Sequence, residues 1–386
     1  MKYITNIFIS SIAKVINFIL NIVIIRFWGG EVFGGYITIQ NIVLSAYTLV
    51  NVGQSYNLLY FRQDKIRRIV VLLNFFLPLL LTPIVFLVLS VKYSLSNMDI
   101  LAVIVAVFLN SISGVYIANM YYEQMSKRAV LISSMSPIAL LPLMFLAGNV
   151  GLNLSHREII LIFYLIPVLI CILVYRNIGV LSLFDLNKVK ALLLINLLKR
   201  GGGLVLGIFS LGMINTLFLL ETYSSQPEVN EVIAVIFPVL GLILLIPTSL
   251  NNLILSDKDN LNNIFLLKLI GLLFLAGAFI YFVGWKLYLL AVGHVVSLSD
   301  LELIVFILGS VFLSVAKLLL SMLLKMKLLK VVNKIMFFVV VFLVLLLSYI
   351  KASEILQWAS IYLIVNFIVM FILYGLYYMK SVKVHE

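Results

Sequence analysis

The stretch LIVFILGSVFLSVAKLLLSMLL, residues 303–324, carries a single charge, that of Lys317. A helix needs about 20 apolar residues to cross a hydrocarbon core roughly 30 Å thick. This stretch therefore predicts a membrane-spanning helix. Stretches like it fill almost all of the chain, in which 64% of the 386 residues are hydrophobic and 11% are charged. With a mean hydropathy of +1.21, the sequence predicts an all-α polytopic membrane protein.

Twelve stretches are predicted to span the membrane. They lie at residues 4–27, 34–60, 69–91, 100–122, 129–148, 159–175, 203–220, 232–252, 264–283, 303–324, 335–350 and 355–379. The longest break, at residues 176–202, has leucine and valine at helical spacing and predicts an amphipathic linker at the cytoplasmic interface. It separates two six-helix bundles, at residues 1–175 and 203–386. Because six is an even number, both bundles enter the membrane with the same orientation, and a central cavity between them is expected.

Positive charge is distributed unevenly over the polar breaks, and the formal net charge is +12. If the amino terminus is cytoplasmic, the even-numbered breaks and both ends hold most lysines and arginines, including the cluster at residues 62–68. The odd-numbered breaks hold Lys92, Arg157, Lys286 and Lys351, with Arg26 at the edge of the first span. The positive-inside rule then places both termini in the cytoplasm. The basic charge therefore indicates topology, and nucleic-acid binding is not expected.

Sequence signatures of an enzyme or of a metal protein are absent from the chain. The glycine run at residues 201–203 lacks the following lysine and Ser/Thr of a phosphate-binding loop. The three histidines are scattered singly, and Cys171 has no second cysteine to pair with. We expect no catalytic residue, no metal and no cofactor, and coupling to a proton or sodium gradient stays open.

Polar residues inside the spans are the remaining candidates for function. Helical steps of three and four join Asn6, Ser10, Lys14, Asn17 and Asn21 in the first span, and Ser310, Ser314, Lys317 and Ser321 in the tenth. The second span carries several amides, among them Gln40 and Asn51. A lysine at the bilayer centre costs roughly 2.5–3.5 kcal/mol, so such faces are expected to contact protein, water or ligand. The alternative is that Asn and Ser join helices through hydrogen bonds, and it is preferred for isolated residues such as Asn215 and Asn366.

Lys14 and Lys317 have no evident counter-ion, because no Asp or Glu lies in the central part of any predicted span. An anionic ligand in a hydrated cavity would supply one, and deprotonation of the desolvated lysine is the competing solution. Arg26 fits a substrate contact and a snorkelling interfacial arginine equally well. The candidate substrate-binding residues are Lys14, Asn17, Asn21, Arg26, Gln40, Asn51 and Lys317.

Residues 25–36, IRFWGGEVFGGY, resemble the R-F-L-G-x-E-x-[FY]-G-x-Y stretch that follows the first span of polysaccharide flippases. These form a family of the multidrug/oligosaccharidyl-lipid/polysaccharide exporter superfamily. Residues 238–250 and 321–327 resemble the eighth span of the family and the end of its tenth. In the related lipid II flippases a cationic residue stands at the position of Lys14, and by analogy it meets the lipid-linked diphosphate. The chain departs from the pattern near Asn215, where relatives often carry an Asp.

The resemblance implies a flippase that moves undecaprenyl-diphosphate-linked oligosaccharide repeat units to the outer leaflet of a bacterial inner membrane, for O-antigen or another surface polysaccharide. It implies alternating access between the two bundles, in which the cationic candidates attract the diphosphate and the amides bind sugar hydroxyls. The expected partners are this lipid-linked oligosaccharide, the bilayer, and the polymerase and chain-length machinery of the pathway. No bond is made or broken, so the protein is not expected to be an enzyme.

Two other functions stay open from the sequence. An ion-coupled small-molecule exporter of the multidrug type would have the same fold, but an exporter of organic cations normally needs a carboxylate within the membrane. A polysaccharide polymerase or ligase would need catalytic residues in a sizeable external loop, whereas the external breaks here are short.

Overall fold

The structure is a computed structural model, in which the described residues are 2–51, 73, 76, 78, 90, 95–122, 125–174, 213–224, 226–256, 263–293, 296, 298–326, 328–349, 352 and 354–383. These residues are helical apart from short connections, which confirms the all-α class for this part of the chain. Contacts divide the chain into two compact units. The first comprises Met1–Trp28 and Gly35–Phe209, and the second comprises Gly29–Gly34 and Ser210–Glu386.

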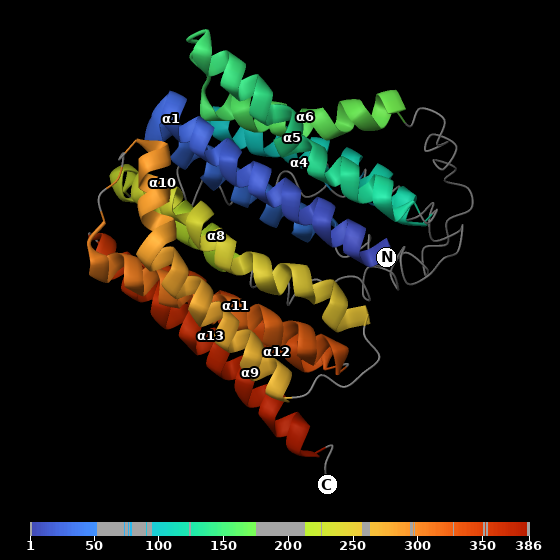
Figure 1. Ribbon diagram of the computed structural model, residues 1–386, viewed down its shortest axis with the longest axis vertical. Coiled ribbons are helices and arrows are strands. Elements are labelled where there is room, and N and C mark those ends of the chain that lie inside the picture. The colour runs from blue at the N-terminus through green and yellow to red at the C-terminus, as the bar shows by residue number, and fades with distance from the viewer. Residues whose placement is uncertain are drawn as a thin grey trace. The chain divides into compact units, whose positions relative to one another are not determined.

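The first unit contains α4 (Asn97–Tyr122), α5 (Ser126–Asn149), α6 (His156–Val174) and most of α1 (Lys2–Asn51). α4 packs against both α5 and α6, and α5 packs against α6 (Figure 1). Buried side chains from all three helices meet in one cluster that includes Met120, Ile132 and Cys171. Cys171, the single cysteine of the chain, is therefore a core residue.

α1 consists of two helical arms joined at a kink at Gly29, where φ is 83° and ψ is 173°. A straight helix of its 50 residues would be about 75 Å long, more than twice the hydrocarbon thickness of a bilayer. The kink divides it into two arms, residues 2–28 and 30–51. The sequence predicts a break over residues 28–33 here, and this expectation is wrong in extent, since the non-helical geometry is confined to one glycine.

Both arms of α1 meet the same end of the first unit at the kink. Phe27 packs against Gly148 at the end of α5, and Gly35 packs against His156 at the start of α6. The Trp28 Nε1–H donates to the carbonyl oxygen of Leu152 in the connection between those helices, at 3.0 Å. The two arms therefore lead away from one end of the unit, as two consecutive spans would.

Three described helices begin with a serine followed three residues later by an acidic residue. The pairs are Ser96 and Asp99 at α4, Ser155 and Glu158 at α6, and Ser299 and Glu302 at α11 (Asp300–Lys325). At α6 and α11 the carboxylate accepts a hydrogen bond from the serine backbone N–H, at 2.7 Å and 2.8 Å. This arrangement is a capping box, which satisfies N–H groups that have no partner within the helix. It explains where these three helices start.

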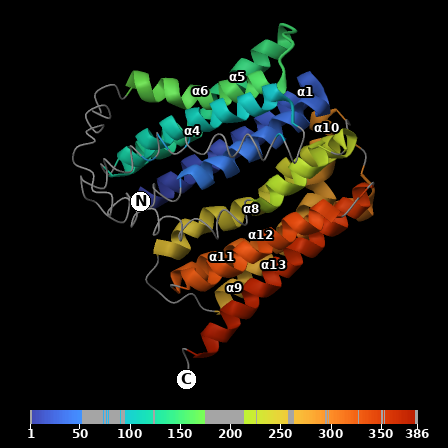
Figure 2. The same ribbon diagram turned by 180° about the vertical axis from the view of Figure 1, so that it is seen from behind.

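The second unit is organised around α11. The other helices are α8 (Pro227–Ser256), α9 (Asn263–Phe279), α10 (Trp285–Val292), α12 (Leu329–Tyr349) and α13 (Ile355–Lys383), and residues 213–224 are also helical. α11 packs most extensively against α13 and α8 and also contacts α9 and α12 (Figure 2). It approaches α13 closely at Gly309, where a Cβ would overlap the ring of Tyr362.

Eight described segments are long and apolar enough to cross a membrane. They are Ile12–Thr48, Asn97–Ile117, Arg128–Asn149, His156–Leu173, Pro227–Pro247, Leu266–Val292, Asp300–Leu323 and Ile355–Met379, and Val331–Leu347 is a shorter apolar helix. The first of them covers residues 12–27 of the first predicted span and 34–48 of the second, with the bend at Gly29 between them, and residues 52–60 of the second lie outside the described part. The chain is therefore a multi-pass membrane protein. The third predicted span (apart from residues 73, 76, 78 and 90), most of the seventh and the linker at 176–202 lie outside the described residues, so the total of twelve stays a prediction.

The ninth predicted span ends too early. The sequence places its end at residue 283, but α9 continues through a π-helical turn, Ile280–Gly284, into α10. α10 ends at Gly293, which is in the left-handed conformation. The reason is that Lys286 is exposed while Trp285 and Tyr288 are buried, so the helix continues with its one charge facing outward.

Candidate functional site

The first arm of α1 carries the clearest candidate site. Lys14, Asn17 and Asn21 share one face of the helix; Lys14 and Asn17 are half-buried, and Asn21 is 4% exposed. Within the part of the chain that the structure describes, Lys14 forms no ion pair and no hydrogen bond. This half-buried lysine therefore lacks a counter-ion among the described residues.

The amides beside Lys14 are also unsatisfied. The Oδ1 atoms of Asn17 and Asn21 are buried and accept no hydrogen bond from the described residues. Leaving such an acceptor unpaired costs about 1–3 kcal/mol. A cation followed by two acceptors, over about 10 Å of helix, suits a ligand that has both an anionic group and hydroxyl donors.

The polar groups on the second arm of α1 are largely satisfied by their own helix. The Gln40 amide donates to the Tyr36 hydroxyl at 3.3 Å, and the Asn41 amide donates to the Ile37 carbonyl at 2.9 Å. Gln40 is half-buried, so a ligand contact is compatible with its position. Asn51 is the last residue of α1, and its side chain lies outside the described part of the structure.

Arg26 is not close to Lys14 along the helix. The two residues belong to the same arm and are separated by about 18 Å of helix axis. Arg26 is exposed and stands one turn before the kink at Gly29. An exposed arginine at the end of a span fits the interfacial interpretation of this residue better than a shared site with Lys14.

The serine stripe on α11 has partners inside the second unit. The hydroxyl groups of Ser310 and Tyr362 are 3.4 Å apart, and the Ser321 hydroxyl donates to the Lys317 carbonyl at 2.9 Å. Lys317 itself is half-buried. Ser310 therefore joins α11 to α13, as the alternative interpretation predicts. Ser321 bonds to its own helix, and the buried Ser314 Oγ has no hydrogen-bond partner among the described residues. A combined role for Lys14 and Lys317, which belong to different units, stays a prediction.

Sequence reasoning missed a polar and aromatic cluster around Tyr362 in α13. The Tyr362 hydroxyl donates to Asn215 Oδ1 at 3.2 Å, so the hydroxyl of Ser310 must donate to Tyr362. The rings of Phe218 and Phe306 lie 5.2 Å and 5.9 Å from the Tyr362 ring. Asn215, where the resemblance leads one to expect an Asp nearby, is thus a half-buried acceptor inside the second unit. A tyrosine in an apolar span gives no sequence signal for this role.

Sequence reasoning also missed a buried charge cluster at the start of α4 and α6. The Asp99 carboxylate is 3% exposed and lies 2.6 Å from Arg157 Nε and 2.8 Å from His156 Nε2. The Ser96 hydroxyl donates to its other oxygen at 2.7 Å. The capping spacing of Ser96 and Asp99 was visible in the sequence, but the pairing with α6 was not. This cluster ties two helix ends together.

Comparisons with known proteins bear on the fold. No protein-family model and no curated protein matches the chain. The chain is similar to a crystal structure of MATE in the bent conformation, with a TM-score of 0.54 and 15% sequence identity over 98% of this chain and 94% of that one. At this identity the likeness establishes the architecture only. The chain therefore has a MATE-like fold.

Proposed function

We propose that this protein is a transporter that moves a lipid-linked, diphosphate-bearing oligosaccharide across the membrane, of the undecaprenyl-diphosphate type. The observation that carries the proposal is the face of α1 on which, among the described residues, Lys14 has no counter-ion and the buried Oδ1 atoms of Asn17 and Asn21 have no donor. The MATE-like fold and the motif at residues 25–36 support it.

The unpaired groups on this face of α1 have an energetic cost. A charge placed within a membrane protein and lacking a partner is unfavourable, and the same holds for each unpaired acceptor. A diphosphate supplies the missing negative charge and forms charge-assisted hydrogen bonds with the ammonium group. The hydroxyl groups of a sugar supply the missing donors. One ligand thus satisfies all three side chains.

The remaining candidates have secondary roles in this proposal. Gln40 and Asn51 would contact further sugar hydroxyls, while Lys317 and Arg26 would attract the diphosphate on entry or release. The polyprenyl tail would stay in the lipid. The two halves of the chain would alternate between access from the cytoplasm and access from the outside. No bond is made or broken in such a cycle.

An ion-coupled small-molecule exporter is the second candidate, because the MATE-like fold suits it equally. A carrier of organic cations would need a carboxylate at membrane depth. In the described helices, acidic residues lie only near helix ends or next to the kink at Gly29. This distribution favours an anionic substrate over a cationic one.

Transport in reconstituted vesicles tests the proposal. Purified protein is inserted into liposomes with a fluorescent undecaprenyl-diphosphate oligosaccharide, and a membrane-impermeant quencher reports movement between leaflets. The wild type is expected to flip the lipid, Lys14→Gln to lose most of this activity and Lys14→Arg to keep part of it. Lys286→Gln, which changes an exposed lysine of α10, is the matched control and is expected to behave as the wild type.

Two outcomes would contradict the proposal. If Lys14→Gln flips the lipid at the wild-type rate, the assigned role of this lysine is wrong. If the wild type flips no lipid-linked oligosaccharide but takes up organic cations under a proton or sodium gradient, the second candidate function is correct.

A further inference from the structure

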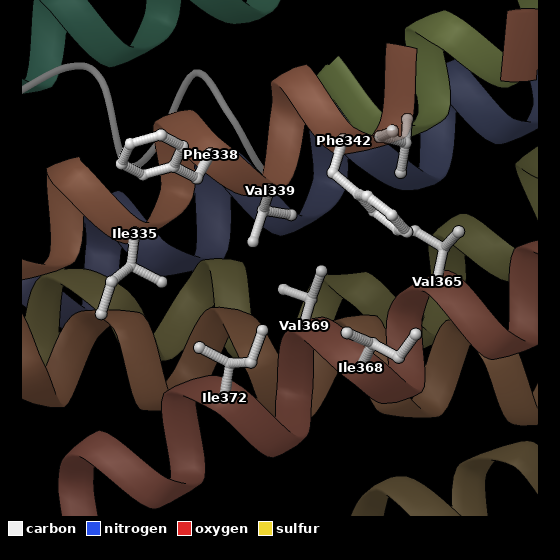
Figure 3. A pocket seen from close by; sticks show the side chains of 9 residues that line it. Ile335, Phe338, Val339, Phe342, Val365, Ile368, Val369 and Ile372 are labelled. Carbon is white, nitrogen blue, oxygen red and sulfur yellow. The ribbon is translucent and has the colours of Figure 1, made fainter. Parts of the chain in front are cut away.

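An apolar groove of about 260 Å³ lies between α12 and α13 in the second unit. Side chains from the two helices face one another across it (Figure 3). Ile335, Phe338 and Phe342 line it from α12, and Val365, Ile368 and Ile372 line it from α13. Because Ile335 lies near Ile372 and Phe342 near Val365, the two helices are antiparallel along the groove (Figure 3).

The groove is open on one side. Its floor is buried, since Val365 and Val369 are 4% and 1% exposed. Its walls are exposed, since Phe338, Phe342 and Ile368 are 59%, 54% and 39% exposed. In a protein that spans a membrane, an exposed apolar surface on a spanning helix is solvated by lipid. The open side of the groove is therefore accessible to an acyl chain.

One end of the groove is basic. Lys334 is exposed and directly precedes Ile335, the first residue of the groove on α12. Lys325, Lys327 and Lys330 precede it in the sequence, and Lys380 and Lys383 follow Ile372 on the antiparallel α13. No acidic residue occurs between residues 325 and 353 or between residues 355 and 383. Lys334 thus places a positive charge where the groove begins.

The length of the groove distinguishes between occupants. From Ile335 to Leu343 it covers about 12 Å of helix axis. A helix that crosses the hydrocarbon core is roughly 30 Å long, whereas the hydrocarbon part of one leaflet is about 15 Å deep. The groove therefore matches one acyl chain that enters from the basic end.

We propose that the groove between α12 and α13 is a binding site for an anionic phospholipid, with one acyl chain between the two helices and the phosphate at Lys334. Anionic headgroups gain about 1 kcal/mol per lysine near a membrane surface, and the groove adds burial of the chain. The site is separate from the face of α1 that carries the proposed function, and it does not depend on the transported substrate.

Native mass spectrometry of the detergent-solubilised protein tests this site, with phosphatidylglycerol and phosphatidylethanolamine of matched acyl chains as probes. The wild type is expected to retain one phosphatidylglycerol in preference to phosphatidylethanolamine. Val339→Trp fills the groove from α12, and Ile368→Trp fills it from the exposed edge on α13. Both variants are expected to abolish retention of phosphatidylglycerol. Lys334→Gln is expected to weaken phosphatidylglycerol binding about fivefold and to leave phosphatidylethanolamine binding unchanged.

The matched controls lie on α9. Leu275→Trp is the control for the tryptophan variants, because it adds the same bulk at a side chain that is 69% exposed. Lys268→Gln is the control for Lys334→Gln, because it removes another exposed lysine. Both controls are expected to bind the two lipids as the wild type does. The proposal is overturned if the wild type binds the two lipids equally, or if both tryptophan variants keep the lipid while remaining folded in a thermal unfolding assay. It is also overturned if the retained species is a polyprenyl diphosphate, or if a second copy of the chain covers the groove.

Discussion

At the residue scale, the buried polar groups of the described helices are of two kinds. Those of Tyr362 and Asn215 in the second unit pair with each other, and they contribute to packing. Those of Asn17 and Asn21 in the first unit do not pair within the described residues. An unpaired group lowers stability, and residues that lower stability commonly serve binding or catalysis. Other buried polar atoms of the described residues are unpaired as well, among them Ser314 Oγ and Asn366 Oδ1 in the second unit, so α1 is distinguished by two unpaired acceptors that share a face with Lys14.

Asn21→Leu is expected to make the protein more stable and less active. Leucine has a similar shape and leaves no buried acceptor unpaired, so the free energy of unfolding should rise by on the order of 1 kcal/mol. Asn215→Leu is the matched control, because it removes the acceptor of the Tyr362 hydroxyl and should lower stability. Thermal unfolding in detergent and transport in vesicles measure the two effects. An Asn21→Leu protein that is less stable than the wild type would contradict this interpretation.

Asp99→Asn is expected to destabilise the first unit. The amide keeps the shape of the side chain but leaves Arg157 without its counter-ion at a buried position. Arg157 is partly exposed, so the loss should be on the order of 2 kcal/mol, below the 3–5 kcal/mol of a fully buried pair. Glu158→Gln changes the exposed capping box of α6, the helix that carries Arg157, and should lower the free energy of unfolding by less than about 1 kcal/mol. Equal unfolding temperatures for the two variants would show that the Asp99 cluster has no special role.

At the scale of elements, the glycines of residues 29–35 have a structural explanation. Gly29 adopts a conformation that is almost exclusive to glycine. Gly30 and Gly34 allow close contact with Glu231 and Asn230 at the start of α8, and Gly35 allows close contact with His156. The stretch that resembles the flippase motif is thus a packing device at the bend of α1.

Gly29→Ala tests the kink. A Cβ at this position meets no atom within 4 Å, so the cost comes from the backbone alone and should be about 1–3 kcal/mol. Gly271→Ala on α9 is the control, because its Cβ is equally free of contacts and its backbone is helical; it should be neutral or slightly stabilising. A thermal unfolding comparison of the two variants decides the point. Equal unfolding temperatures would mean that α1 can bend without a glycine.

The elements themselves were largely predictable, because a run of about 20 apolar residues is a local property of the sequence. Helix ends were less predictable: Lys286 suggests a loop, but α10 continues past it with that lysine exposed. Contacts between distant segments were not predictable. Tyr362 and Asn215 are separated by 147 residues, and no spacing rule relates them. The polar face at Lys14, Asn17 and Asn21 was visible because helical periodicity is local, but its missing partners required the structure.

At the scale of the whole molecule, the proposal requires that a single substrate provide charge and hydroxyl donors to one helix while its tail remains in the lipid. The MATE-like fold supplies the architecture, and the uneven lysine distribution predicts which side faces the cytoplasm. The central claim is that Lys14 binds a diphosphate. This claim predicts a difference in affinity and does not depend on the rate of any conformational step.

The most direct measurement is the affinity of the purified wild type and of Lys14→Gln for undecaprenyl-diphosphate-linked oligosaccharide. Charge-assisted hydrogen bonds contribute about 1.5–3 kcal/mol, so Lys14→Gln should bind roughly tenfold or more weakly. Lys286→Gln should bind as the wild type does. Equal affinities of the wild type and Lys14→Gln would contradict the claim.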